Sequence, residues 1–430
     1  MKIAVTGLWH LGCVTAACLA EAGHEVLAYD ANHDVVAQLQ QGKAPLFEPH
    51  LDTLITKNIA AKQLTFSAQL ADLADADIIW ATYDTPVDEN DIADVNYVTM
   101  EIKNALPYLK ENALVLISSQ LPVGTIRQVQ LYCSQHFPEK HITFACSPEN
   151  LRLGKAIEVF TQPDRVIVGL QTEADKARIQ ILLHPFTHNI IWMSIESAEM
   201  TKHALNAFLA TSVVFINELS TLCEQVGADA REVEKGLKSE DRIGPKAYLR
   251  PGNAIAGGTL ARDVNYLIQI GQQQAVKTSL FSALLDSNHA HKQWSCRRVM
   301  NTLKDLKHKT IVALGLTYKA GTDTLRRSTA VETCEWLHQQ GATVIAYDPS
   351  LTQLPAELNK FIQLKSNLTD ALDKADAVII STEWPEFMNL TAEILLSSMN
   401  QPLVFDAAGF LANHLSQDSR IRYFSVGRQT

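Results

Sequence analysis

The sequence predicts an α/β protein in which two doubly wound domains are joined by a long central helix or helical domain. Apolar, strand-like runs alternate with helical stretches over the first half of the chain, a pattern typical of a mostly parallel sheet covered on both faces. A strand–glycine–helix–strand–aspartate unit occurs at the start and again from Thr310. Between them, a helical stretch without proline runs from Ser197 to Val226 and stops at Gly227.

The first unit begins with the apolar run Lys2–Val5, which leads to Gly7. A helical pattern over residues 11–22 closes at Gly23, and a second apolar run, Glu25–Tyr29, ends in Asp30. Further strands are expected at Ile78–Ala81, Leu114–Ser118, Ile142–Cys146 and Val166–Val168.

The second unit reads TIVALGLTYKAG from Thr310, continues as a helix through residues 336–340, and ends in ATVIAYDP. Apolar residues surround much of the central helix, as expected if it is buried between domains or at a subunit interface; burial inside the core of one domain is the alternative. We predict three domains: 1–195, a central helical region over 196–300, and 301–430.

Composition narrows the classes of function. The 430 residues are 47% hydrophobic and 20% charged, as in globular proteins, and the net charge of -10 argues against a nucleic-acid partner. No signal peptide and no membrane span are predicted. The seven scattered cysteines form no CxxC pair, so we expect reduced thiols in a cytoplasmic protein and no metal site.

The turn after the first strand is a candidate dinucleotide-binding site. Gly7 and Gly12 occupy the first and third positions of a GxGxxG pattern, and Trp9 stands at the second. Such a turn presents backbone N–H groups and a helix N-terminus to a pyrophosphate. Asp30, 23 residues after Gly7, is placed to accept hydrogen bonds from a ribose diol and to repel a 2′-phosphate, which favours NAD over NADP. An α/β domain that merely uses a tight turn is the alternative.

Six ordered motifs carry a resemblance over essentially the whole chain. They are SPENLRLGKAI with PDRVIVG at 147–169, TKHALNAFLATSVVFINELSTLCEQVGAD at 201–229, DRIGPKAYLRPG at 241–252, LGLTYKAGTDTLRRSTA at 314–330, TEWPEF at 382–387 and SVGR at 425–428. Together they resemble the UDP-glucose/GDP-mannose dehydrogenase family.

The resemblance implies an NAD-binding Rossmann domain, a central dimerisation region and a Rossmann-like UDP-sugar-binding domain. It also implies oxidation of the C6 hydroxyl of a nucleotide sugar in two steps, through an aldehyde and a cysteine-bound thioester, with NAD reduced in each step. The expected partners are a nucleotide sugar and a second copy of the chain, paired through the central helix.

Several residues match the catalytic positions of the family. Lys202 and Asn206 lie one helical turn apart and match the residues that hold the oxyanion and a catalytic water. Asp263 matches the aspartate that orients that water, and Glu149 matches the general base for hydrolysis.

Ligand-binding residues are assigned in the same way. We expect NAD to be bound by Gly7, Trp9, His10, Leu11, Gly12, Asp30, Thr85, Gln120 and Arg326. We expect the substrate to be bound by Glu149, Leu151, Arg152, Lys202, Arg242, Lys246, Tyr248, Gly257 and Lys319.

The nucleophile position departs from the family. AIAGGTLARD at 254–263 corresponds to the family's GFGGSCFPKD, which places Thr259 at the cysteine, and no cysteine lies between Cys223 and Cys296. Gln120 replaces a threonine, Leu153 a glutamate, and Asp406–Gly409 reads DAAG in place of DGRN.

A threonine hydroxyl is a poor substitute for a thiol, whose pKa is about 8.5. Three outcomes therefore stay open. The enzyme could stop at or start from the aldehyde. It could oxidise a hydrated aldehyde directly, with Glu149 and Asp263 activating water. Or the chain could bind its ligands without catalysis, in a regulatory or scaffolding role.

Overall fold

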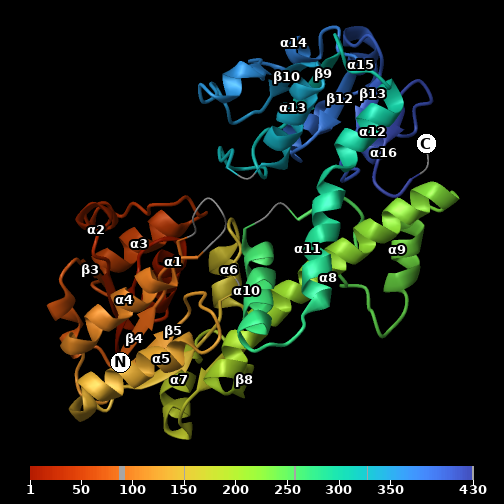
Figure 1. The fold of residues 1–430 in the computed structure, drawn as a ribbon. Helices are drawn as coiled ribbons and strands as arrows, with labels where there is room; N and C mark the ends of the chain where they lie inside the picture. The colour runs from red at the N-terminus through yellow and green to blue at the C-terminus, as the bar shows by residue number, and fades with distance from the viewer. Residues whose placement is uncertain (87–92, 150, 256–257, 327, 429–430) are drawn as a thin grey trace. The chain divides into compact units, whose positions relative to one another are not determined.

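The computed structural model describes residues 1–86, 93–149, 151–255, 258–326 and 328–428 (Figure 1). The chain divides into two compact units, Met1–Ala204 and Leu205–Thr430, and each is described by itself. Helix α8, Ile195–Val226, is continuous through the point of division and contains the stretch predicted from Ser197.

Within its described residues, the first unit contains an eight-stranded sheet in the order β3-β2-β1-β4-β5-β6-β7-β8. Neighbouring strands are parallel except β6 and β7, which are antiparallel. The strands are β1 (Lys2–Thr6), β2 (Glu25–Tyr29), β3 (Leu64–Ser67), β4 (Ile78–Ala81), β5 (Leu114–Ile117), β6 (Thr143–Cys146), β7 (Val166–Leu170) and β8 (Ile190–Met193). The six strands predicted here are confirmed, and β3 and β8 were missed.

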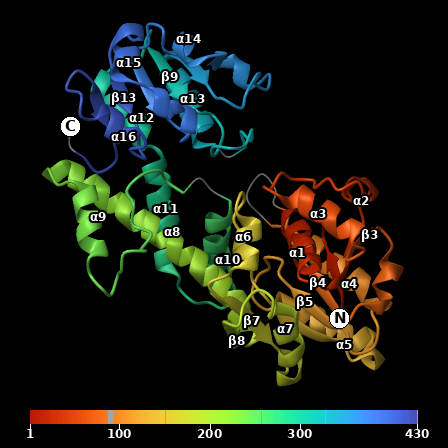
Figure 2. The same ribbon diagram turned by 180° about the vertical axis from the view of Figure 1, so that it is seen from behind.

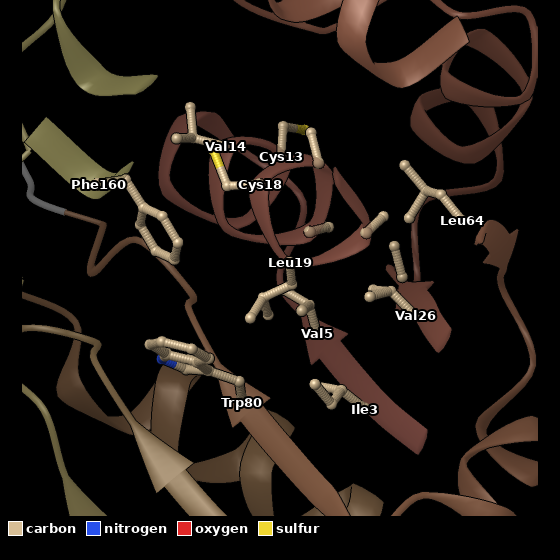
Figure 3. Close-up of a cluster of buried hydrophobic side chains, with 14 of the residues drawn as sticks. Ile3, Val5, Cys13, Val14, Cys18, Leu19, Val26, Leu64, Trp80 and Phe160 are labelled. Atoms are coloured by element: carbon tan, nitrogen blue, oxygen red, sulfur yellow. The ribbon is translucent and has the colours of Figure 1, made fainter. Parts of the chain in front are cut away.

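Helices cover both faces of this sheet because successive strand residues point to opposite sides. The helices are α1 (His10–Glu21), α2 (His33–Gln40), α3 (Leu51–Ala60), α4 (Val95–Ala105), α5 (Thr125–His136), α6 (Ala156–Thr161) and α7 (Lys176–Leu183). Ile3 and Val5 join the core beneath α1, with Leu19 and Phe160 (Figure 3). Ala4 joins the opposite core beneath α4 and α5.

The second unit contains a parallel sheet of six strands among its described residues, in the order β11-β10-β9-β12-β13-β14. Two of its strands, β9 and β13, are labelled in Figure 2. The strands are β9 (Thr310–Leu314), β10 (Thr343–Tyr347), β11 (Gln363–Leu364), β12 (Ala377–Ile380), β13 (Leu403–Phe405) and β14 (Arg422–Phe424). The helices are α9 (Ala230–Lys238), α10 (Thr259–Gln273), α11 (Ser279–Lys292), α12 (Trp294–Leu303), α13 (Thr329–Gln339), α14 (Leu368–Leu372), α15 (Ala392–Ser398) and α16 (Ala412–Leu415).

The predicted repeat of the opening unit is confirmed at the level of hydrogen bonds. The Gly7 N–H donates to the Tyr29 carbonyl at 3.0 Å, and the Gly315 N–H donates to the Tyr347 carbonyl at 2.8 Å. Both glycines have a positive φ, 89° and 87°. The two units differ after the turn, since α1 begins at His10 whereas α13 begins only at Thr329.

Helix α8 is long and apolar enough to cross a membrane by length and composition alone, with 39% of its most apolar window buried. A core helix passes the same test. Buried polar groups on α8 have partners in the protein: Asn217 Nδ2 donates to the Asn253 carbonyl at 3.1 Å, and Glu224 accepts from Trp294 Nε1 at 2.8 Å. Since buried polar groups are costly without such partners, the face of α8 that carries Asn217 and Glu224 is packed inside the protein.

Candidate functional site

The turn between β1 and α1 requires glycine at two positions. A Cβ atom at Gly7 would lie 2.6 Å from Tyr83 Cδ1, and one at Gly12 would lie 2.0 Å from the Gly7 carbonyl oxygen. Both distances are far below van der Waals contact, so a larger residue would displace the turn. The two glycines therefore allow the close packing that sets the turn, and the turn leads into the N-terminus of α1, where backbone N–H groups can bind a pyrophosphate.

Trp9 occupies the N-cap of α1, at the position of the missing middle glycine. Its φ and ψ are -98° and -151°, an extended conformation that any residue adopts without strain. The side chain is 46% exposed. The substitution therefore costs the turn nothing in backbone energy, and its effect must arise from the bulk that the indole presents to a ligand.

Replacing Trp9 with glycine is expected to tighten NAD binding roughly tenfold, which corresponds to about 1.4 kcal/mol. The reason is that removal of the indole allows the pyrophosphate to approach the backbone closely. Titration calorimetry with NAD measures the change, and Trp9→Phe, which retains the bulk, is the matched control. Equal or weaker binding by Trp9→Gly would show that the indole does not obstruct the cofactor.

Asp30 and its counterpart in the second unit differ in how many of their hydrogen-bond acceptor sites the protein already fills. Asp30 Oδ2 accepts from the Leu8 N–H at 2.7 Å and Oδ1 from the Asn32 N–H at 2.9 Å, and the residue stays partly exposed. A carboxylate accepts about four hydrogen bonds, so acceptor sites remain for a ribose diol.

The counterpart, Asp348, is 1% exposed. It accepts from Leu316, Thr317, Ser350 and the Trp384 indole N–H. Its acceptor sites are filled by the protein. Of the two similar turns, the first is the one equipped to hold a dinucleotide ribose.

Two predicted cofactor residues meet at the carboxyl ends of β4 and β5. Thr85 Oγ1 donates to the Gln120 carbonyl at 2.6 Å. The loop that contains Gln120 is held from α8: Glu199 accepts from the Gly124 and Ile126 N–H groups at 2.7 and 3.2 Å, and His203 Nε2 lies 3.0 Å from the Leu121 carbonyl. Burial raises the pKa of Glu199, against the opposing effect of these two amide donors.

Lys202, which lies between Glu199 and His203 on α8, reaches the predicted substrate segment. Lys202 Nζ donates to the Glu149 carbonyl at 2.7 Å, and both residues are partly exposed. Leu151 and Arg152 follow Glu149 closely, and the Arg152 side chain is exposed. The structure therefore brings the Lys202 ammonium to the backbone of the segment that contains Glu149.

A second predicted pair lies in the other unit. Asn206 Nδ2 donates to Asp263 Oδ2, and the two residues are 5% and 0% exposed. This bond fixes the orientation of the amide group. Thr259 is the first residue of α10 and is exposed, following Gly258 at the N-cap.

The remaining predicted substrate residues lie on exposed loops of the second unit. The Arg242 side chain is 87% exposed and pairs with Glu240 at 2.8 Å. Lys246 and Tyr248 are exposed in the same loop, and Gly257 lies outside the described residues. Lys319 lies between β9 and α13, with its ammonium group 5.6 Å from the centroid of the Tyr318 ring, and the predicted cofactor residue Arg326 lies in the same segment.

Three polar residues that organise the site were missed from the sequence: Glu48, Glu199 and His203. Glu199 and His203 lie one turn apart on α8. Their spacing of four residues predicts that both side chains project from the same face of the predicted helix. Glu48 lies in a loop and had no local signal, because its partners are distant in sequence.

Comparison with known proteins gives three matches to models of one family. They are the NAD binding domain (residues 1–187), the central domain (196–290) and the UDP binding domain (312–413) of the UDP-glucose/GDP-mannose dehydrogenase family. The three models match consecutive parts of the chain in the family's order and together cover most of its length.

Individual relatives agree with the family models. The UDP-glucose 6-dehydrogenase YwqF of Bacillus subtilis is 32% identical over 100% of this chain and 98% of its own length. The UDP-glucose 6-dehydrogenase of Rhizobium meliloti is 32% identical, with 100% of both chains covered. A UDP-glucose dehydrogenase structure from Pyrobaculum islandicum has a TM-score of 0.85 at 25% identity, covering 99% of this chain and 98% of that one.

Proposed function

Since the chain belongs to the UDP-glucose/GDP-mannose dehydrogenase family, we propose that it oxidises the C6 hydroxyl group of a nucleotide sugar, with NAD as the cofactor. The substrate would be UDP-glucose or a related UDP-hexose, and the product the aldehyde or the uronic acid. The donation from Lys202 to the Glu149 carbonyl carries this proposal, because it places an ammonium group against the segment that would hold the sugar.

We propose three domains: an NAD-binding domain over 1–195, a helical dimerisation domain over 196–300, and a UDP-sugar-binding domain over 301–430. The turn with Gly7 and Gly12 would hold the cofactor pyrophosphate, and Asp30 the ribose. NAD, when bound, accepts a hydride from C6. We place the protein in the cytoplasm, where its seven cysteines would stay reduced.

The protein's own residues would then stabilise charge and position water. The Lys202 ammonium would stabilise the negative charge that develops on the C6 oxygen. The Asn206 amide, oriented by Asp263, would hold the water that takes up the C6 hydroxyl proton as the hydride leaves. Glu149 would act as the general base for hydrolysis. Each role is assigned because the residue matches a position of the family's motifs.

Thr259 occupies the nucleophile position of the family in this proposal. Its hydroxyl lies at the start of α10, and a hydroxyl there has far less nucleophilic character than a thiolate. We therefore propose that the second oxidation is slow or absent, so that the aldehyde, or a slowly formed uronate, leaves the enzyme.

The test is NADH absorbance with a panel of UDP- and GDP-sugars. One NADH for each sugar would indicate oxidation to the aldehyde, and two would indicate oxidation to the uronate. NAD and UDP-sugars that bind saturably without turnover would overturn the enzymatic proposal in favour of a binding role, which none of the relatives described above supports.

We also propose that two copies of the chain pair through α8. Phe208, Phe215 and Leu222 are 72%, 50% and 60% exposed and recur every seven residues along the helix, the spacing of a helix-pairing seam. An apolar groove of about 320 Å³, lined by Phe215, Leu222 and Leu280, lies between α8 and α11. Exposed apolar surface of this kind is typical of protein–protein interfaces.

Replacing Phe215 with glutamate is expected to convert the dimer to a monomer, because a carboxylate buried in an apolar interface has no partner. Analytical ultracentrifugation at micromolar concentration measures the mass. Ile181→Glu is the matched control, since Ile181 is 61% exposed on the first unit. A Phe215→Glu variant that stays dimeric would place the interface elsewhere.

A further inference from the structure

Glu48 is a buried carboxylate in the loop between α2 and α3. Its side chain is 1% exposed. Oε2 accepts from His10 Nε2 and from the Gly154 N–H, each at 2.8 Å, and Oε1 accepts from the Ala156 N–H at 2.8 Å. Because a carboxylate only accepts hydrogen bonds, His10 must carry its proton on Nε2.

The three donors belong to two different parts of the first unit. His10 is the first residue of α1 and directly follows Trp9 in the phosphate-binding turn. Gly154 and Ala156 lie 106 and 108 residues away from Glu48 in the chain, in the segment that runs from Leu151 into α6. One carboxylate thus joins the cofactor turn to the segment expected to hold the sugar nucleotide.

The segment beyond Leu151 depends on this anchor. Residues 152–155 are all exposed, and Gly154 adopts a φ of 85°. A segment with so little buried apolar surface is fixed mainly by its hydrogen bonds, two of which end on Glu48.

The carboxylate is held in its charged form despite its burial. Burial by itself raises the pKa of Glu48. The hydrogen bonds from His10, Gly154 and Ala156 lower the pKa by more than burial raises it, so the pKa lies below its usual value. All three donors therefore meet a full negative charge, and such hydrogen bonds are about twice as strong as neutral ones.

We propose that Glu48 is a positioning residue that couples NAD binding at the His10 turn to nucleotide-sugar binding at residues 151–156. The inference rests on the proposed function. A ligand that orders the turn also fixes His10. Because His10 is hydrogen-bonded to Glu48, the carboxylate is fixed as well, and it in turn fixes the N–H groups of the substrate segment. The second ligand then meets a segment that is already ordered, and the same coupling must hold in the reverse direction.

The test measures the dissociation constants of NADH and UDP-glucose by calorimetry, each alone and with the other at saturation, a pair that cannot react. In the wild type each ligand should tighten the other roughly tenfold, within the usual range of such coupling. Glu48→Gln should lose most of this factor, because its amide nitrogen opposes an N–H donor. Glu111→Gln, a change at an exposed carboxylate, is the control.

A second pair of variants tests the link from the other end, in case Glu48→Gln does not fold. His10→Phe removes the donor and should abolish the coupling, whereas His10→Gln restores an N–H donor and should retain it. Coupling that survives both Glu48→Gln and His10→Phe would overturn the inference.

The same titrations separate this inference from the proposed function. A wild-type protein that binds both ligands without mutual tightening would overturn the coupling alone. A wild-type protein that binds neither ligand would overturn the proposed function, and the coupling with it.

Discussion

Replacement of Lys202 with methionine is expected to lower kcat by about 100- to 1,000-fold, the usual effect of removing one donor that stabilises a developing oxyanion. Methionine retains most of the volume of lysine and removes the ammonium group, so the change isolates the charge. The Lys202 ammonium also lies 2.7 Å from the Glu149 carbonyl. Its removal should therefore leave the substrate segment less ordered, which would raise KM in addition to the fall in kcat. Steady-state kinetics with UDP-glucose and NAD separate the two effects.

Lys360→Met, at an exposed lysine of the second unit, is the control and should retain full activity. A Lys202→Met variant with unchanged kcat and a normal melting temperature would remove Lys202 from the chemical step. The ammonium would then serve only to hold the backbone at Glu149.

Replacement of Thr259 with cysteine is expected to increase uronate formation and to raise the yield toward two NADH for each sugar. Thr259 is exposed at the first position of a 15-residue helix, and a helix N-terminus lowers the pKa of a thiol from its ordinary value of about 8.5. A cysteine at this position would therefore carry more thiolate than a free cysteine does. Mass spectrometry of the product, together with the NADH yield, measures the change.

Thr259→Ser is the matched control, because it retains a hydroxyl group and should leave the products as they are. If Thr259→Cys also leaves the product distribution unchanged, the site has been rebuilt for a reaction that does not use a covalent sulfur intermediate.

The sheet could be predicted where strands are apolar runs followed by a turn residue. β1 and β2, which lead to Gly7 and Asp30, are of this kind. β3 reads LTFS and its residues alternate between buried and less buried, while β8 is at most partly buried. Both are edge strands of the sheet. β3 lacks the continuous apolar run that marks a central parallel strand, whereas β8 reads IIWM, a run that the local sequence did contain and that was missed.

The candidate site was only partly readable, because its contacts join distant residues. Asn206 and Asp263 are 57 positions apart in the chain. Only the resemblance to a family indicated that both belong to one site and what each would do there. The two repeated aspartates, Asp30 and Asp348, look alike in sequence. What separates them is the set of donors around Asp348, which includes Trp384 from another loop. Glu48 bonds residues more than 100 positions away, and no periodicity or spacing predicts such a contact.

The central claim is that a sugar's primary alcohol gives up its C6 hydrogen to NAD on this protein. The most direct measurement supplies UDP-glucose carrying deuterium at C6 together with NAD, and follows the label by mass spectrometry. With two deuterium atoms at C6, we expect each reduced cofactor to carry one deuterium, the aldehyde product to retain one and the uronate product to retain none. The initial rate should be lower than for the unlabelled substrate wherever hydride transfer limits turnover. Reduced cofactor without deuterium, or a substrate that returns unchanged from a protein that binds both ligands, would contradict this account.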